Sequence, residues 1–174
     1  NKKNALGTIW SYGHRNPQGI AINPLTNDIW SSEHGPKGGD ELNIIKKGFN
    51  YGWPLFTYGV DDDGSKISTI SEEKATEITE LPIKFWDPSI GISNITYYRG
   101  QPFNNWKNNL LVTSLKQENL FRLVIEDDRI IEEEMLFSIG SRIRDIEIGN
   151  DGFIYLSLEY PGEVIKLYPV LVKS

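Results

Sequence analysis

A glycine-rich loop that ends on two acidic residues is the first candidate for chemistry in this sequence. Residues 33–41 read EHGPKGGDE, with three Gly and one Pro before the adjacent carboxylates of Asp40 and Glu41. Calcium prefers carboxylate and backbone carbonyl oxygens, whereas zinc would need several His or Cys, and the sequence has only two His and no Cys. The loop therefore favours calcium over zinc. The alternative interpretation is a Gly-rich hairpin with a solvated Asp–Glu pair.

Cationic and amide side chains form a second candidate group. Residues 12–19 (YGHRNPQG) place several hydrogen-bonding side chains directly before a predicted strand, and Lys116, Arg142 and Arg144 lie at the ends of other predicted strands. Cations that converge in this way are unfavourable unless an anionic ligand compensates them, so the group predicts an anion site. The alternative is structural: Arg15 would bind a nearby carboxylate, and Arg142 and Arg144, two apart on a strand, would pair with Asp or Glu.

Other motifs carry less chemistry. Residues 61–64 (DDDG) lack the distal Glu and the spacing of an EF-hand loop. Trp86 lies in a Pro-flanked loop and is the best candidate among the tryptophans to stack on a planar ligand, although core packing explains such residues too. Neither His14 nor His34 is accompanied by a Gly-x-Ser-x-Gly turn, so a Ser-His-Asp site is not supported.

Composition limits the function classes further. The chain has 174 residues, 39% of them hydrophobic and 24% charged, which is enough for one core. A net charge of -6 argues against a nucleic-acid partner. Apolar runs fall short of the roughly 18 residues that a membrane span needs. The chain starts without Met or a leader, and we expect any signal peptide to lie upstream or to have been removed.

The elements that must position these residues are short β-strands. No long window shows a helical apolar period, whereas β-branched and aromatic runs bounded by turn residues recur along the chain. Asp151-Gly152 predicts a tight two-residue hairpin turn. The predicted strands are residues 19–22, 28–31, 94–98, 110–113, 119–123, 145–148, 153–156 and 163–167.

These strands form a repeat. Residues 15–44 align with residues 142–165, and a weaker copy covers residues 95–123. The step from Leu111 to Tyr155 is 44 residues, close to the roughly 40 to 45 of a β-propeller blade. The sequence therefore predicts an all-β chain, a partial β-propeller of three to four blades over residues 1–174. Residues 58–81 do not fit the repeat and are expected as a long loop or short helix inserted between blades.

An open arc of three to four blades cannot close, and its ends would expose strand edges and an apolar face. We therefore expect the chain to be part of a longer one of roughly 330 to 380 residues. Otherwise a second chain must supply the missing N-terminal blades.

Several motifs in one order resemble a known family, the soluble quinoprotein sugar dehydrogenases (glucose, aldose and sorbosone dehydrogenases), which use pyrroloquinoline quinone (PQQ) on a six-bladed propeller. The resemblance covers almost the whole chain. The chain would correspond to the C-terminal half, or slightly more, of the family's full propeller domain. The motifs are GHRNPQG at residues 13–19, EHGP at 33–36, GDELN at 39–43, NYGWP at 50–54, WDPSI at 86–90, Leu115-Lys116 and RIRD at 142–145.

The resemblance implies a set of site residues. Arg15, Asn16 and Gln18 would line the quinone site, with Arg15 also in a catalytic role, polarising the quinone. Lys116, Arg142 and Arg144 would contact the quinone carboxylates and carbonyls, and Trp86 would lie near its plane. The metal residues that it implies are Gly35 and Pro36 for the calcium bound to the cofactor, and Asp40, Glu41 and Tyr51 for a structural calcium.

The implied activity is oxidation of an aldose at its anomeric carbon by hydride transfer to PQQ, with calcium assistance and an external electron acceptor. In the family the His base belongs to an earlier blade, and neither His14 nor His34 takes its place, so this chain alone is expected to be an incomplete enzyme. The resemblance also implies a periplasmic or secreted location. The alternative is a non-catalytic, calcium-stabilised propeller that binds carbohydrate or protein.

Overall fold

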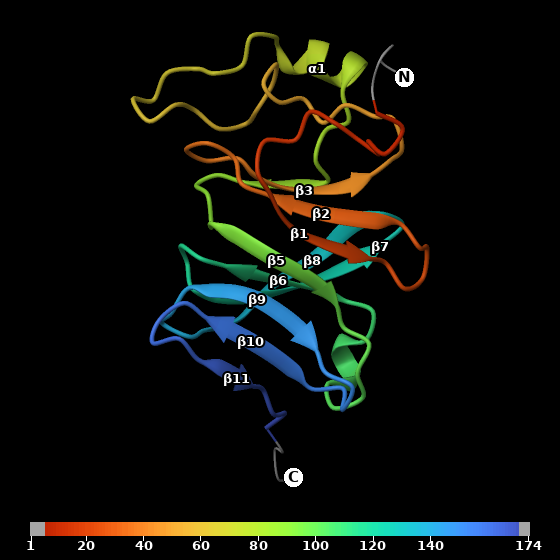
Figure 1. Cartoon of the computed structure of the whole chain (residues 1–174), viewed down its shortest axis with the longest axis vertical. Coiled ribbons are helices and arrows are strands. Elements are labelled where there is room, and N and C mark those ends of the chain that lie inside the picture. Colours follow the sequence, from red (N-terminus) through yellow and green to blue (C-terminus); the bar gives the residue numbers. More distant parts are fainter. Residues whose placement is uncertain (1–5, 171–174) are drawn as a thin grey trace.

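The computed structural model describes residues 6–170 and is built from three antiparallel sheets that lie side by side (Figure 1). The first sheet contains β1 (Pro17–Ile22), β2 (Ile29–Glu33), β3 (Asp40–Ile45) and β4 (Lys84–Trp86). The second contains β5 (Ile92–Tyr97), β6 (Leu110–Ser114), β7 (Asn119–Glu126) and β8 (Arg129–Ser138). The third contains β9 (Ile143–Ile148), β10 (Ile154–Leu158) and β11 (Val164–Lys166). Consecutive strands pair within every sheet, so each sheet is an up-and-down blade of a partial propeller.

The predicted repeat is confirmed. Each predicted strand overlaps an observed one, and the three aligned units are β1–β3, β5–β7 and β9–β11. Leu111 and Tyr155 each occupy the second position of the second strand in their sheets. Gly152 has the expected positive φ of 79°, but the predicted two-residue turn is wrong, because residues 149–153 separate β9 from β10.

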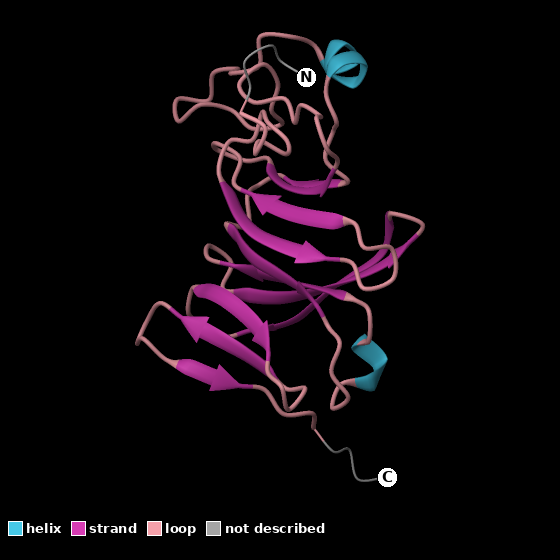
Figure 2. Cartoon of the chain, turned by 45° about the vertical axis from the view of Figure 1, so that its right-hand side comes forward, coloured by secondary structure: helices cyan, strands magenta, loops and turns pink. Residues whose placement is uncertain are grey.

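The insertion lies within the first sheet, which corrects the expectation that it separates two blades. Residues 46–83 leave β3 and return as β4, which pairs with β3 from Asp40 opposite Trp86 to Leu42 opposite Lys84. The insertion carries the only α-helix of the described residues, α1 (Glu72–Ile78), capped by Ser71. In Figure 2 this helix and its loops lie beyond one end of the sheets, and a single 3-10 turn, η1 (Asn104–Trp106), lies near the other.

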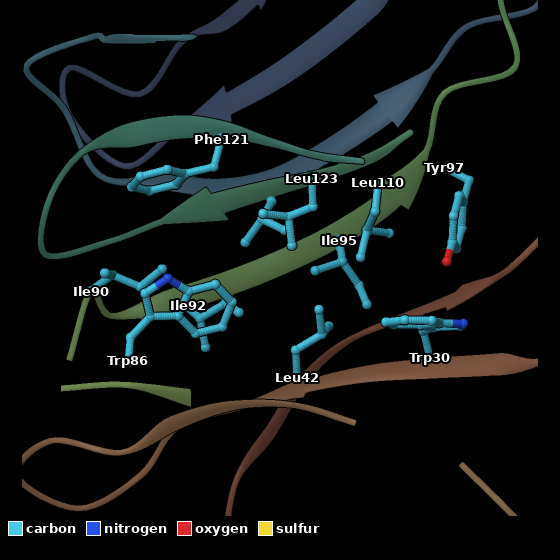
Figure 3. Close-up of a cluster of buried hydrophobic side chains, with 11 residues drawn as sticks. Trp30, Leu42, Trp86, Ile90, Ile92, Ile95, Tyr97, Leu110, Phe121 and Leu123 are labelled. Atoms are coloured by element: carbon cyan, nitrogen blue, oxygen red, sulfur yellow. The ribbon is translucent and has the colours of Figure 1, made fainter. Parts of the chain in front are cut away.

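Two apolar layers hold the sheets together, one on each side of the second sheet. Figure 3 shows the layer against the first sheet, where Ile92 and Ile95 of β5 meet Leu42 of β3 and the ring of Trp30. The other layer joins Leu111 to side chains of β9 and β10. No helix among residues 6–170 is long and apolar enough to cross a membrane.

The first strand of each sheet is its inner strand. Of these, β5 lies between β1 and β9 and contacts both. Ser32 Oγ donates a hydrogen bond of 2.7 Å to the carbonyl of Ser93, and Ser93 Oγ donates one of 2.6 Å to the carbonyl of Ile143. A Cβ on Gly19 would come within 2.8 Å of the Asn94 and Ile95 backbone. Glycine at this position therefore allows β1 to approach β5 closely.

Tyr98 connects the second sheet to the third. Its side chain is fully buried, its hydroxyl donates to the carbonyl of Gly152 at 2.9 Å, and the amide of Phe103 donates to it at 3.0 Å. Because both partners would lose their hydrogen bond, Tyr98→Phe should lower the free energy of unfolding by about 1 to 3 kcal/mol.

Urea unfolding of the Tyr98→Phe variant measures this loss. The matched control is Tyr160→Phe, which removes a hydroxyl from a side chain that is 81% exposed. Equal midpoints for the two variants would contradict the role given to Tyr98.

Candidate functional site

One edge of the three sheets collects the predicted site residues. In an antiparallel meander the first strand starts, the second ends and the third starts at the same edge. The segment before β1 and the loops between β2 and β3, β4 and β5, β6 and β7, and β8 and β9 therefore all lie on the left-hand side of the sheets in Figure 1. This cationic edge, as we call it, carries Arg15, Gly35, Lys116, Arg142 and Arg144.

Arg15 lies over backbone carbonyls. Its Nη1 donates to the carbonyl oxygen of Gly35 at 2.8 Å and to that of His34 at 3.2 Å. Its guanidinium carbon lies 5.4 Å from the ring centroid of Trp53, within cation–π range. The structural alternative expected the Arg15 side chain to bind a carboxylate, but the acceptors of its guanidinium are these carbonyls. The carboxylate of Glu33 instead accepts from the Arg15 backbone amide, at 2.7 Å.

Asn16 and Gln18 lie next to Arg15, at the start of β1, and are exposed. Gln18 Nε2 donates to Asn16 Oδ1 at 3.0 Å. The two amides thus form a polar pair on the same edge, with capacity left for a ligand.

Arg142 and Arg144 share one partner at the start of β9. Glu159 Oε2 lies 3.1 Å from Nε of Arg142 and 2.7 Å from Nη2 of Arg144. The structural alternative, pairing with an acidic residue, is therefore confirmed for both. Lys116 follows β6, is exposed, and has no side-chain partner within residues 6–170. One carboxylate thus pairs with two cations, and Lys116 has no carboxylate partner among residues 6–170.

Trp86, which the resemblance places near the plane of the quinone, is part of the core. Its side chain is 8% exposed and packs with Ile90 and Ile92 (Figure 3), and its indole N–H donates to Glu133 at 2.8 Å. The sequence pattern hides this because β4 has three residues, and its last residue enters the layer between the first two sheets.

The acidic residues of the loop are buried, so the alternative of a solvated Asp–Glu pair is wrong. Asp40 is 2% and Glu41 is 9% exposed, and Glu33, which sequence reasoning missed, is 3% exposed. Asn43 Nδ2 donates to Glu33 Oε1 and to Glu41 Oε2, both at 3.2 Å. Burial, reinforced by the charge of Glu33, raises the pKa of Glu41 to about 8.

Asp40, which the resemblance implies as a calcium contact, accepts three hydrogen bonds within the protein. Its Oδ1 accepts from the Gly35 amide at 3.2 Å and from Ser89 Oγ at 2.8 Å, and its Oδ2 accepts from the Ile92 amide at 2.9 Å. Three donors leave this carboxylate little capacity for a cation. Asp40 therefore ties the glycine-rich loop to the segment that enters β5.

Tyr51 also uses its hydroxyl within the protein. The hydroxyl donates to the carbonyl of Ile44 at 2.6 Å and accepts from the Lys46 amide at 2.7 Å. Its ring stacks on His14 with centroids 4.5 Å apart. A metal would therefore meet Tyr51 at its backbone carbonyl. Gly35 also offers a carbonyl, which Arg15 occupies here, and Pro36 follows it in the loop.

A small cavity of about 10 Å³ lies beside Glu41. It has room for about one water molecule or ion. Its lining includes Glu33, His34, Gly35, Glu41 and Tyr51. His34 Nε2 and Asn43 Oδ1 are buried nearby without a hydrogen-bond partner. Residues 6–170 contain no group of three or more His, Asp or Glu arranged for a metal, so a cation here would rely on carbonyl oxygens as well.

Comparison with known proteins shows the family of the chain. The family model described as Glucose / Sorbosone dehydrogenase matches residues 1–166. The chain is 42% identical to the aldose sugar dehydrogenase YliI of Escherichia coli over 167 residues, which is 95% of this chain and 45% of that protein.

Solved structures give the same result. One, described as a glucose dehydrogenase, superposes with a TM-score of 0.84 at 42% identity, covering 93% of this chain and 47% of the other. The PQQ-bound aldose sugar dehydrogenase of Streptomyces coelicolor superposes with a TM-score of 0.65 at 25% identity, covering 92% of this chain and 45% of the other. The chain spans about half the length of these proteins, and it belongs to the glucose/sorbosone dehydrogenase family.

Proposed function

We propose that this chain carries part of the cofactor site of a PQQ-dependent aldose dehydrogenase. The observation that carries the proposal is the set of four cations, Arg15, Lys116, Arg142 and Arg144, that three sheets bring to one edge. PQQ has three carboxylates and offers the negative charge that these side chains need. The PQQ-bound relative of similar fold supports this choice of ligand.

The two halves of the cation set have different partners before the cofactor binds. Among residues 6–170 the Arg15 guanidinium makes hydrogen bonds only to neutral carbonyls, and Lys116 is exposed. Arg142 and Arg144 already share Glu159, so the cofactor carboxylates would have to compete with this side chain. Because all three groups are about half exposed, their pairing is weak and displacement costs little. Asn16 and Gln18 would complete the polar lining, and Trp86 is left out because it is buried.

Calcium fits the buried acidic pocket. The cavity beside Glu41 is the size of one ion, two buried carboxyl groups compete for one amide of Asn43, and Asn43 Oδ1 has no donor. We assign Glu41 and the Tyr51 carbonyl to the structural ion. The carbonyls of Gly35 and Pro36 would hold the cofactor-bound ion, and Arg15 would have to release Gly35 for this.

The proposed reaction is the oxidation of an aldose at its anomeric carbon. PQQ, when bound with calcium, supplies the hydride acceptor. Arg15 would hold a quinone oxygen and stabilise the negative charge that develops there. A base must remove the hydroxyl proton, and His14 is not available for this, because it is held between Ser11, Glu33 and the Tyr51 ring. We therefore place the base on the part of the protein that this chain does not include.

The remaining partners follow from the proposed reaction. They are a sugar, an external electron acceptor, and the N-terminal blades from the same gene product or another chain. We propose a periplasmic or secreted location. A non-catalytic, calcium-stabilised propeller that binds carbohydrate or protein remains the second candidate function. The buried pocket beside Glu41 favours it, because that pocket needs no quinone.

Cofactor binding should depend on Arg15. Arg15→Ala removes a charge-assisted contact and should weaken PQQ binding about ten- to a hundredfold. The matched control is Lys66→Ala, which removes an exposed cation from the insertion. Titration of the apo-protein with PQQ, followed by the cofactor absorbance, gives both affinities. Equal affinities for the two variants would favour the non-catalytic propeller.

Calcium should stabilise the protein in a pH-dependent way. The folded state raises the Glu41 pKa from 4.5 to about 8, so metal-free protein should lose stability as the pH rises between these values, where only the unfolded carboxyl is ionised. Calcium needs the ionised carboxylate and should reverse the loss, by about 2.7 kcal/mol at 100 times Kd.

Thermal melts at pH 5 and pH 8, with calcium or with chelator, test this expectation. Glu41→Gln resembles the neutral carboxyl, so it should remove the response to calcium. Asp62→Asn, at an exposed loop position, should keep the response. A calcium response that survives Glu41→Gln would place the ion elsewhere.

The first sheet has an apolar flank that further blades would cover. Ile20 and Ile22 of β1 are 69% and 51% exposed. Ile20 lines a hollow of about 270 Å³ together with Trp10 and Ile45. Expressed alone, the 174 residues should therefore self-associate and should oxidise no aldose when PQQ and calcium are added. Light scattering and a dye-linked assay check both points. A monodisperse monomer of 19.8 kDa that turns over glucose would refute the expectation.

A further inference from the structure

We propose that Glu33 is a positioning residue that holds the backbone of Arg15 and Asn16 at the cationic edge. The inference rests on the proposed function and deepens it. Glu33 ends β2, and its side chain is 3% exposed. A carboxylate this deeply buried is costly unless donors surround it, so its partners show what it does.

Four donor groups surround the Glu33 carboxylate. Oε2 accepts from the Arg15 amide at 2.7 Å and from the Asn16 amide at 3.3 Å. Oε1 accepts from Asn43 Nδ2 at 3.2 Å and lies 3.1 Å from His14 Nδ1. Both oxygens are thus engaged, and three of the four partners are the consecutive residues 14–16. These are the residues that bring the Arg15 side chain to the edge.

The strand ladder cannot hold this segment by itself. Pro17 lies opposite Glu33 in the β1–β2 register, but it has no amide hydrogen, and the register shifts between Pro17 and Gly19. A backbone hydrogen bond of this segment, from the His34 amide to the Asn16 carbonyl at 3.0 Å, lies just beyond the end of β2. The backbone amides of Arg15 and Asn16 need acceptors that the strand pairing does not supply. The Glu33 carboxylate accepts from both amides and so holds this segment in place.

Glu33 also fixes the carbonyls that Arg15 contacts. His34 and Gly35 follow Glu33 directly, and Arg15 Nη1 reaches both of their carbonyl oxygens. The Glu33 side chain thus sets the distance between the backbone of Arg15 and the two carbonyl oxygens that the Arg15 guanidinium contacts. His14 is held from its other side by Ser11 Oγ, 2.9 Å from Nε2, and by the stacked Tyr51 ring.

Glutamine tests the role with little change of shape. Its single acceptor oxygen cannot serve four donors, and its NH₂ group would face donors. In Glu33→Gln, hydrogen exchange at the Arg15 and Asn16 amides should become at least about tenfold faster, while amides of β3 keep their rates. PQQ affinity should fall about tenfold. Glu77→Gln, on the exposed face of α1, is the matched control and should change neither value.

A double variant shows whether Glu33 acts through Arg15. If it does, Glu33→Gln should weaken PQQ binding by only about twofold in an Arg15→Ala background, because the side chain that it positions is already absent. Arg15→Ala alone should leave amide exchange unchanged. All variants are made in the full-length protein. If Glu33→Gln does not fold, Glu33→Asp keeps the charge on a shorter side chain and should give a smaller change in the same direction.

The outcomes separate this inference from the proposed function. Faster exchange across β2 and β3 as a whole, or additive losses of PQQ affinity, would make Glu33 a residue of general stability and overturn the positioning role. If no form of the protein binds PQQ, the proposed function fails. Exchange at Arg15 and Asn16 then still decides whether Glu33 holds this segment.

Discussion

The close approach of the inner strands β1, β5 and β9 is the constraint on which the rest of the structure depends. It requires small or hydroxylated side chains at the contacts, and Gly19 of β1, Ser93 of β5 and Ser32 of the adjoining strand β2 provide them. Once these strands lie side by side, the antiparallel order of each sheet places alternate loops of all three sheets at the same edge. Arg15 and Arg144, which are far apart in the sequence, therefore lie at the same edge, each near the start of the first strand of its sheet.

The same edge holds exposed cations and buried carboxyl groups. Its four cations and their partner Glu159 are exposed, whereas Glu33, Asp40 and Glu41 of the first sheet are buried. Each buried carboxyl group has a different set of hydrogen-bond donors. Glu33 accepts from backbone and side-chain donors, and Asp40 accepts from three donors. Glu41 accepts from the side-chain amide of Asn43, which also donates to Glu33. Glu41 has the fewest donors of the three, and burial, together with the charge of Glu33, raises its pKa to about 8.

Sequence reasoning predicted the repeat because it depends on local patterns, namely alternating apolar residues and turn residues. It missed β8, because residues 132–134 are all Glu and the strand is exposed at a sheet edge. It missed β4, since three residues between loops carry no period. The family motifs placed Arg15, Lys116, Arg142 and Arg144 on one edge, yet the motifs could not show that Trp86 is buried. They also gave no signal for Glu33, whose role depends on a strand register.

Asn43 links the two parts of the site. Its amide nitrogen donates both to Glu33, which holds the Arg15 segment, and to Glu41, which we assign to calcium. An ion at Glu41 would draw that carboxylate toward itself and leave the amide to Glu33 alone, so the metal and the Arg15 segment would favour each other. The unpaired Asn43 Oδ1 points to the same coupling, because a buried acceptor without a donor is an unfavourable arrangement that a cation or an ion-bound water could relieve. Calcium and the quinone would then stabilise each other's sites through one side chain, without a contact between the ion and Arg15.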